Sequence, residues 1–199
     1  MNKLWGDKMP TEEYALVLDY LSRGKSASFK SEPVAQVMGT EYFTLLEIVP
    51  KTELKTLEKI YIGKDEREKV EFIKKRISFK ELTSTSVAEI EKAIEKLVLE
   101  NKQKFLDFFN KSSSITIKRH QLELLPGLGK KHMMEILSER RKKPFESFEE
   151  IEKRIHLMPN PMKIIIKRIL SELEEEDKKH FLFVRPPARE QREFQRKRF

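Results

Sequence analysis

LELLPGLGKKHMMEIL, residues 122–137, is the stretch that decides how the C-terminal half of this sequence folds. Apolar residues recur at helical spacing on both sides of a central Pro-Gly-Leu-Gly. Pro126 ends the first helix because it cannot continue the hydrogen-bond ladder, and Gly127 and Gly129 permit a tight turn because they have no Cβ atom. The stretch therefore predicts two helices joined by a hairpin, with the second helix beginning at about Lys130.

The start of that second helix has the features of an anion-binding site. The first N–H groups of a helix have no partner within it and carry the positive end of the helix dipole. Lys130 and Lys131 add full charges beside them. A nucleic-acid phosphate is the natural occupant of such a site. The alternative is a plain helix–helix turn, because glycine after an apolar helix end is an ordinary stop signal.

The longer segment LPGLGKKHMMEILSERRKKPFESFEEI (125–151) resembles a helix-hairpin-helix module. The resemblance covers residues 116–156 and rests on the apolar-Pro-Gly-apolar-Gly hairpin and on a later Phe-x-Ser-x-Glu segment, here Phe145, Ser147 and Glu149. It implies that the hairpin backbone binds a phosphate of DNA or RNA without reading the base sequence. One departure is Met133, where the family pattern has a small residue.

A second segment, MPNPMKIIIKRIL (158–170), is similar to residues 125–137 when Met158 is aligned with Leu125. This echo predicts a tandem pair of hairpins. The second hairpin has Asn160, Pro161 and Met162 in place of the Gly-Leu-Gly, so its amides are less able to approach a phosphate. We expect it to be degenerate and structural, with a helix capped by Ser147 before it.

The N-terminal half is typical of a small β-barrel. YALVLDYL (14–21) alternates, which places Tyr14, Leu16, Leu18 and Tyr20 on one predicted face. An intervening helix is expected at 65–76, and five short strands are expected at 14–21, 34–38, 42–49, 59–63 and 77–82. These elements fit a barrel of the OB type, and an SH3-like barrel or an open sheet fits almost as well.

The predicted fold class is therefore α+β, with an OB-like barrel, a long helix and an all-α tandem helix-hairpin-helix domain. The long helix begins with Ser86 and Glu89 as a capping box and ends in the polar cluster 110–114. The expected boundaries are 10–83 for the barrel, 84–114 for the connecting helix, 115–177 for the helical domain and 178–199 for a short strand and basic tail.

Charge and composition narrow the class of protein. The net charge of +8 is concentrated in residues 115–170 and in the tail from residue 185 onward. Clustered positive charge indicates a polyanionic partner, most often nucleic acid, whereas the alternative is a generically basic protein. The absence of cysteine excludes disulfides and thiolate zinc sites. No apolar run is long enough for a membrane span, so we expect a cytoplasmic protein that does not bind membranes.

Two further basic segments join the hairpin as candidates. RRKK (140–143) is either a solvated helix end or part of the same basic face, and RPPAREQREFQRKRF (185–199) is either an arm that orders on nucleic acid or a solvated end. The apolar run HFLFV (180–184) before this tail is expected to add a strand or to dock onto the barrel. The predicted nucleic-acid-binding residues are Gly127, Leu128, Gly129, Lys130, Lys131, Arg140, Arg141, Lys142, Lys143, Arg189, Arg192, Arg196, Lys197 and Arg198.

The sequence contains no motif for catalysis, a metal or a cofactor. The four histidines show no ligand spacing, the five aspartates are scattered, and neither a phosphate-binding glycine loop nor a Gly-x-Ser-x-Gly nucleophile is present. Carboxylates that are distant in sequence can still converge in a fold. We expect no cofactor, no metal and no enzymatic activity.

As a whole, the chain resembles an archaeal family, number six hundred and fifty-five among the domains of unknown function. The resemblance rests on LELLPGLGKK, PFESFEEI and the upstream strand pattern, and it implies an OB-like barrel followed by a helix-hairpin-helix region. Our first hypothesis is a protein that binds structured RNA, with a ribosomal or other ribonucleoprotein partner. The alternatives are a DNA-binding repair or replication factor or nuclease accessory, and a protein-interaction module with an acidic partner.

Overall fold

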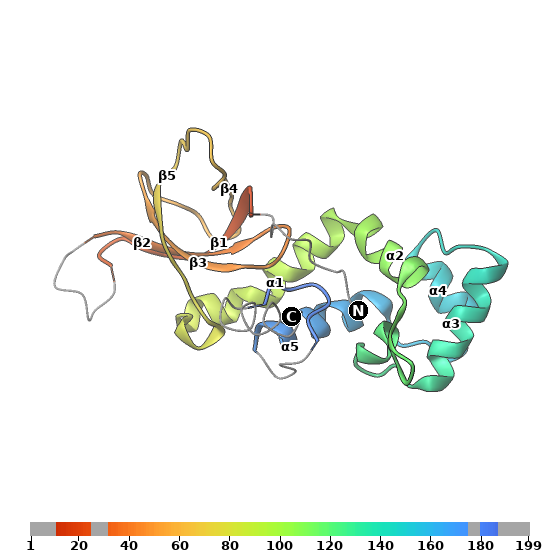
Figure 1. Cartoon of the computed structure of the whole chain (residues 1–199). Coiled ribbons are helices and arrows are strands. Elements are labelled where there is room, and N and C mark those ends of the chain that lie inside the picture. The colour runs from red at the N-terminus through yellow and green to blue at the C-terminus, as the bar shows by residue number, and fades with distance from the viewer. Residues whose placement is uncertain (1–10, 25–31, 175–179, 187–199) are drawn as a thin grey trace, which may run out of the picture. The chain divides into compact units, whose positions relative to one another are not determined.

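A computed structural model describes residues 11–24, 32–174 and 180–186. These residues form an α+β structure with a curled five-stranded antiparallel sheet and five α-helices (Figure 1). The chain divides into two compact units. Of the described residues, those within 11–89 and 172–186 belong to the sheet unit, and Ile90–Ser171 form the helical unit.

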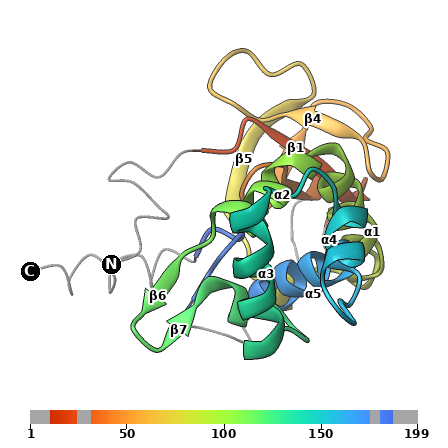
Figure 2. The ribbon, with the colours of Figure 1, turned by 90° about the vertical axis from the view of Figure 1, so that its right-hand side faces the viewer.

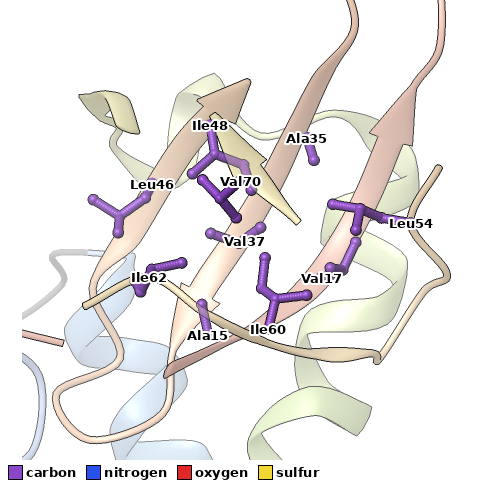
Figure 3. Packing of buried hydrophobic residues seen from close by; sticks show 10 residues of the cluster. All are labelled: Ala15, Val17, Ala35, Val37, Leu46, Ile48, Leu54, Ile60, Ile62 and Val70. Carbon is purple, nitrogen blue, oxygen red and sulfur yellow. The ribbon is translucent and has the colours of Figure 1, made fainter. Parts of the chain in front are cut away.

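The sheet unit is built from five strands in the order β4-β1-β2-β3-β5. Their bounds are β1 (Tyr14–Leu21), β2 (Val34–Gly39), β3 (Leu45–Pro50), β4 (Lys59–Tyr61) and β5 (Val70–Arg76). All four neighbouring pairs are antiparallel. The curl encloses a cluster of buried aliphatic side chains (Figure 3), made by Ala15, Val17, Ala35, Val37, Leu46, Ile48, Leu54, Ile60, Ile62 and Val70.

A β-bulge in β1 changes which side chains share a face. The pairing of β1 with β2 shifts between Val17 and Asp19, so that Val17 lies opposite Val37 and Tyr20 lies opposite Ala35. An extra residue in one strand reverses the alternation beyond it. Tyr20 therefore packs against the enclosed cluster. The expectation that Tyr20 shares a face with Leu16 is wrong for this reason.

Two segments after β4 have a different secondary structure from the one predicted. The segment expected to be helical at 65–76 contains the edge strand β5, and the strand expected at 77–82 contains the 3₁₀ turn η1 (Phe79–Glu81). β5 has only Val70 fully buried, and its register against β3 shifts twice. These shifts remove the period-2 signal, and the backbone hydrogen bonds offered by β3 override the helical spacing of the apolar residues.

The start of α1 (Ser84–Glu100) is fixed by a buried polar network in the sheet unit. The backbone N–H of Ser86 donates to Oγ1 of Thr83 at 3.0 Å, so Thr83 caps the helix and Ser86, the predicted cap, lies inside it. The side-chain amide oxygen of Gln36 accepts from the Thr83 N–H and from the Ser86 hydroxyl, both at 2.8 Å. Thr83 also donates to the carboxylate of Asp19 at 2.7 Å. These buried polar groups are thus satisfied by one another.

The predicted long helix consists of two helices, α1 and α2 (Lys102–Lys111). At Asn101 between them, both the backbone N–H and the side-chain amide donate to the carbonyl of Leu97, at 3.0 and 2.9 Å. Asparagine side chains compete for backbone groups in this way and interrupt helices. In the described part of the chain, no helix is both long and apolar enough to cross a membrane.

Residues 180–186 dock within the sheet unit and form no strand. The buried carboxylate of Glu172 accepts hydrogen bonds from the consecutive N–H groups of residues 182–184, at 2.8 to 2.9 Å. The N–H of Arg185 donates to the carbonyl of Tyr42 at 3.0 Å, and a guanidinium nitrogen of Arg76 donates to the carbonyl of Pro186 at 3.0 Å. Of the two outcomes expected for the HFLFV run, docking is the one observed.

The helical unit continues from α2 through a short hairpin of β6 (Ser114–Thr116) and β7 (Arg119–His120) to the 3₁₀ turn η2 (Gln121–Leu124) (Figure 2). Three helices follow: α3 (Lys130–Lys142), α4 (Phe148–Arg154) and α5 (Pro161–Leu173). The helix expected before the Pro-Gly-Leu-Gly is thus a single 3₁₀ turn. Side chains that are almost fully buried form the core of this unit, including Phe105, Phe109, Leu122, Ile136, Ile151 and Ile165.

Candidate nucleic-acid interface

The Pro-Gly-Leu-Gly segment forms a tight turn on the surface of the helical unit. The N–H of Leu128 donates to the carbonyl of Leu125 at 3.1 Å, and Gly127 between them has a φ of 82°. A turn with proline in its second position and a left-handed third residue needs glycine at the third position. Leu125 and Leu128 are buried and anchor the turn, whereas Pro126 and Gly127 are exposed. We call residues 125–128 the first turn.

The helix that follows the first turn begins without a side-chain cap. Gly129 is the N-cap residue of α3, with an extended backbone (φ −88°, ψ 179°), and a Cβ atom placed on it would meet nothing within 4 Å. The first N–H bonded to the helix start is that of Met133, which donates to the carbonyl of Gly129. Within the described residues, the N–H groups of Lys130 and Lys131 have no acceptor, and both side chains are exposed. The predicted anion site is therefore open to solvent.

The loop between α4 and α5 contains a second turn of the same kind. The N–H of Met158 donates to the carbonyl of Ile155 at 3.4 Å, and Leu157 between them has a φ of 54°. We call residues 155–158 the second turn. The two turns adjoin each other, because a Cβ atom added to Gly127 would lie 3.8 Å from Cγ of Pro159.

The second turn leads to a helix start that is closed by its own side chain. Oδ1 of Asn160 accepts a hydrogen bond from the N–H of Lys163 at 2.9 Å, and Pro161 is the first residue of α5. Asparagine at the N-cap followed by proline is a common start signal for helices. The sequence contains this signal, which correctly identifies Asn160 as a helix cap. The predicted alignment instead placed Asn160 opposite Gly127, inside the turn.

The two turns therefore correspond in a register that differs from the predicted one. By conformation and hydrogen bonding, Leu125 corresponds to Ile155 and Gly127 to Leu157, whereas the apolar pattern aligned Leu125 with Met158. Part of the difference is one extra residue, Pro159, which lies between the second turn and its helix cap Asn160, whereas Gly129 directly follows the first turn. Leu157 is 79% exposed. The sequence analysis missed Leu157, because a leucine gives no signal for a left-handed conformation.

Arg140 serves the interior of the helical unit. Its guanidinium group donates to the carbonyl of Phe109 at 2.8 Å, to the carbonyl of Ser112 at 2.8 Å and to the hydroxyl of Ser112 at 3.1 Å. Burial, with Arg141 beside it, lowers the pKa of Arg140. These bonds tie α3 to the C-terminal end of α2, where helix carbonyls favour a cation. We therefore leave Arg140 out of the proposed interface.

The other basic residues at the end of α3 are exposed. Lys142 pairs with Glu139 at 2.5 Å, and Lys143 pairs with Glu146 at 3.1 Å. Such surface ion pairs contribute little free energy. In the described part of the chain Arg141 makes no ion pair. The predicted tail residues Arg189, Arg192, Arg196, Lys197 and Arg198 lie outside the described residues.

The Phe-x-Ser-x-Glu segment has a structural role. Asn110 holds the buried Phe145 by accepting from its N–H and donating to its carbonyl, both at 2.9 Å. Oγ of Ser147 caps α4 by accepting from the N–H of Glu150 at 3.1 Å, as the sequence predicted. In the described residues, no group of three or more histidine, cysteine, aspartate or glutamate side chains is arranged to hold a metal ion.

This chain is similar to members of one protein family in both sequence and structure. The family described as "Protein of unknown function (DUF655)" matches residues 11–185. The uncharacterized protein MJ0038 of Methanocaldococcus jannaschii is 40% identical over 177 residues, which cover 87% of this chain and 80% of that protein. The crystal structure of Af1531 from Archaeoglobus fulgidus is similar with a TM-score of 0.80 and 41% identity, over 87% of this chain and all of that chain. The chain therefore belongs to the DUF655 family.

Proposed function

We propose that this protein is a non-enzymatic nucleic-acid-binding protein that holds a backbone phosphate at the first turn and the start of α3. The observation that carries the proposal is the contrast between the two helix starts. At α5 the side chain of Asn160 accepts a hydrogen bond from the N–H of Lys163 at the start of the helix. At α3 the cap residue Gly129 has no side chain, so the N–H groups of Lys130 and Lys131 stay open, and both lysine side chains are exposed. An uncapped, cationic helix start is suited to an anion.

In this proposal, η2, the first turn and α3 act as one helix-hairpin-helix module, and α4, the second turn and α5 act as a structural copy. The curled sheet is interpreted as an OB-like barrel, with β4 and β5 as its two edges. The basic tail extends the contact to further phosphates. Backbone amides and lysines contact phosphate and not base edges, so binding is expected to be indifferent to base sequence.

We favour structured RNA over DNA as the ligand, with a ribosomal or other ribonucleoprotein complex as the setting. An OB-like barrel and an arginine-rich tail both suit RNA. The helix start alone serves DNA equally well, since both nucleic acids present the same phosphate. Matched RNA and DNA probes of the same sequence therefore belong in the test.

The test exchanges the two helix caps. Gly129→Asn gives α3 the cap that α5 has, and the extended backbone and open space at Gly129 accept this side chain without strain. Because Oδ1 of Asn160 accepts from the N–H of Lys163, three residues on, the new asparagine is expected to accept from the N–H of His132, and its side chain then covers the helix start where the phosphate would bind. We expect Gly129→Asn to keep or slightly raise the melting temperature and to weaken nucleic-acid binding about tenfold.

The matched control is Asn160→Gly, which removes the cap of α5. Loss of this cap is expected to cost about 0.3 kcal/mol of stability and to leave nucleic-acid affinity unchanged. If Gly129→Asn binds as tightly as the wild type, the start of α3 does not hold phosphate. If the wild type binds neither RNA nor DNA but binds an acidic protein, the basic face is a protein-interaction surface.

A further inference from the structure

The hairpin of β6 and β7 has a fully exposed isoleucine in the connection between its two strands. Ile117 has a relative exposure of 106%, the highest of the large apolar side chains in the described chain. It occupies the two-residue connection between Thr116 and Arg119 together with Lys118. Such connections favour asparagine, aspartate and glycine, so neither turn conformation nor burial accounts for a β-branched apolar residue here.

The base of this hairpin is closed by hydrogen bonds between its two ends and is tied to α3 through Arg140. The N–H of Ser113 donates to the side chain of Gln121 at 2.7 Å, and the N–H of Gln121 donates back to the carbonyl of Ser113 at 3.1 Å. Arg140 holds the adjacent Ser112 through two hydrogen bonds. The tip is ordered by the N–H of Lys118, which donates to the hydroxyl of Thr116 at 3.3 Å. The hairpin of β6 and β7 projects from the helical unit (Figure 2), and Ile117 lies in the connection between its two strands.

The surroundings of Ile117 are cationic. Residues 112–122 contain no acidic residue and include Lys118 and Arg119, whereas Lys111 before them is paired with Asp107 at 2.6 Å. Lys118 and Arg119, next to Ile117, are exposed. An apolar tip with a positive rim complements a partner that has anionic groups outside and apolar surfaces within. Nucleic acid has this arrangement, with phosphates outside and base faces inside.

A lipid bilayer has a similar arrangement, but this hairpin is poorly suited to it. Membrane binding by an apolar face requires several large side chains, and a single isoleucine buries too little apolar surface for this. The same helical unit also carries the open start of α3 described above. These two observations favour nucleic acid over lipid.

We propose that Ile117 is an apolar wedge that packs against the faces of exposed bases in the bound nucleic acid, while Lys118 and Arg119 contact the flanking phosphates. This inference rests on the proposed function and extends it from phosphate binding to contact with unstacked bases. The ligand class is therefore structured nucleic acid with a bulge, loop or flexible step, where a side chain inserts at low cost.

The test uses a short RNA stem-loop that contains a fluorescent adenine analogue in a single-nucleotide bulge, with a fully paired stem as the comparison. The analogue becomes brighter when it is unstacked. Wild-type protein is expected to raise its fluorescence on binding. Ile117→Ser is expected to abolish this rise and to weaken binding about five- to tenfold, as for loss of one modest apolar contact. The conservative variant Ile117→Leu is expected to retain both properties.

Two controls separate the wedge from other effects. Because the Ile117 side chain is fully exposed, the melting temperature of Ile117→Ser is expected to equal that of the wild type. Replacement of Lys118 and Arg119 together by serine is expected to reduce the slope of log affinity against log salt by about 1 to 2, whereas Ile117→Ser leaves the slope unchanged.

The outcomes distinguish this inference from the proposed function. If Ile117→Ser matches the wild type in affinity and fluorescence while Gly129→Asn loses binding, the wedge is refuted and the phosphate site stands. If the wild type binds neither probe, both ideas fail. If the wild type binds vesicles of anionic phospholipid in a manner that depends on Ile117, and no RNA signal is seen, the hairpin is a membrane contact and the wedge is overturned.

Discussion

Leu157 adopts in the second turn the left-handed backbone conformation that Gly127 adopts in the first, with φ angles of 54° and 82°. Each is the third residue of a turn closed by a backbone hydrogen bond. Glycine adopts this conformation without steric cost, whereas an L side chain costs roughly 1–2 kcal/mol there. The second turn therefore keeps the conformation of the first and lacks the residue that makes it favourable.

Exchange of these two residues is expected to change stability in opposite directions. Leu157→Gly relieves the strained conformation and loses little burial, so after the entropy cost of glycine we expect a gain of about 0.5–1 kcal/mol in the free energy of unfolding. Gly127→Leu introduces the strain and is expected to cost about 1–2 kcal/mol. Denaturant unfolding of both variants measures the two changes. A destabilised Leu157→Gly variant would show that the exposed leucine contributes to the fold.

The lysines at the start of α3 and the arginine near its end are expected to affect different quantities. Replacement of Lys130 and Lys131 by alanine should reduce the magnitude of the salt slope of nucleic-acid binding by about 1 to 2 at unchanged melting temperature. Arg140→Ala should leave the salt slope unchanged and lower stability by about 2–4 kcal/mol, because two carbonyls and a hydroxyl lose a charged donor.

Two lysines on α5 provide a control for the lysines of α3. Replacement of the exposed Lys163 and Lys167 on α5 by alanine removes the same charge and should change the slope much less. For the wild type, four to six neutralised phosphates correspond to a slope of about −3 to −5. Equal slope changes in the two lysine pairs would mean that only overall charge matters.

Two truncations are expected to separate binding from stability at the C-terminus. Removal of residues 187–199 takes away the basic tail, so nucleic-acid affinity should fall about tenfold with little change in melting temperature. Removal of residues 180–199 also takes away the buried side chains of residues 181–184, which should lower stability by at least about 3 kcal/mol. Thermal unfolding and a binding titration of both forms decide this. Unchanged affinity in the shorter truncation would exclude the tail from the interface.

His120 is expected to make the stability of the helical unit depend on pH. Burial, and then the positive charge of Arg140, lower the pKa of His120, and its Nδ1 atom accepts from the N–H of Leu122 at 3.1 Å. The folded protein thus favours the neutral ring, while the unfolded chain takes up a proton near pH 6.5. The stabilisation is complete above this pH and declines as the pH falls toward the folded pKa, because the unfolded state then binds more protons.

Asparagine at this position provides an acceptor that does not titrate. We expect wild-type protein to lose more stability than His120→Asn when the pH is lowered from about 8 to about 5, as measured by thermal melts of both proteins. Equal losses in the two proteins would mean that another group is responsible.

Several features were predictable because they depend on interactions between residues that are close in the sequence. The first turn follows from Pro126 and Gly127, because one residue fixes φ and the other tolerates a left-handed φ. The strands β1, β2 and β3 follow from runs of β-branched and apolar residues, and the cap at Ser147 follows from its hydroxyl and the three residues after it. In each case the atoms that decide the conformation lie within a few residues of one another.

Other features depended on partners that are distant in the sequence. β5 is a strand because β3 offers it hydrogen bonds, Tyr20 faces the core because of a bulge in the pairing with β2, and Arg140 is internal because the end of α2 offers it acceptors. At the candidate interface, the sequence determined which residues are basic and where the turn lies. Only the tertiary structure decided which amides stay open and which cations are already bound, because these depend on groups brought together by packing.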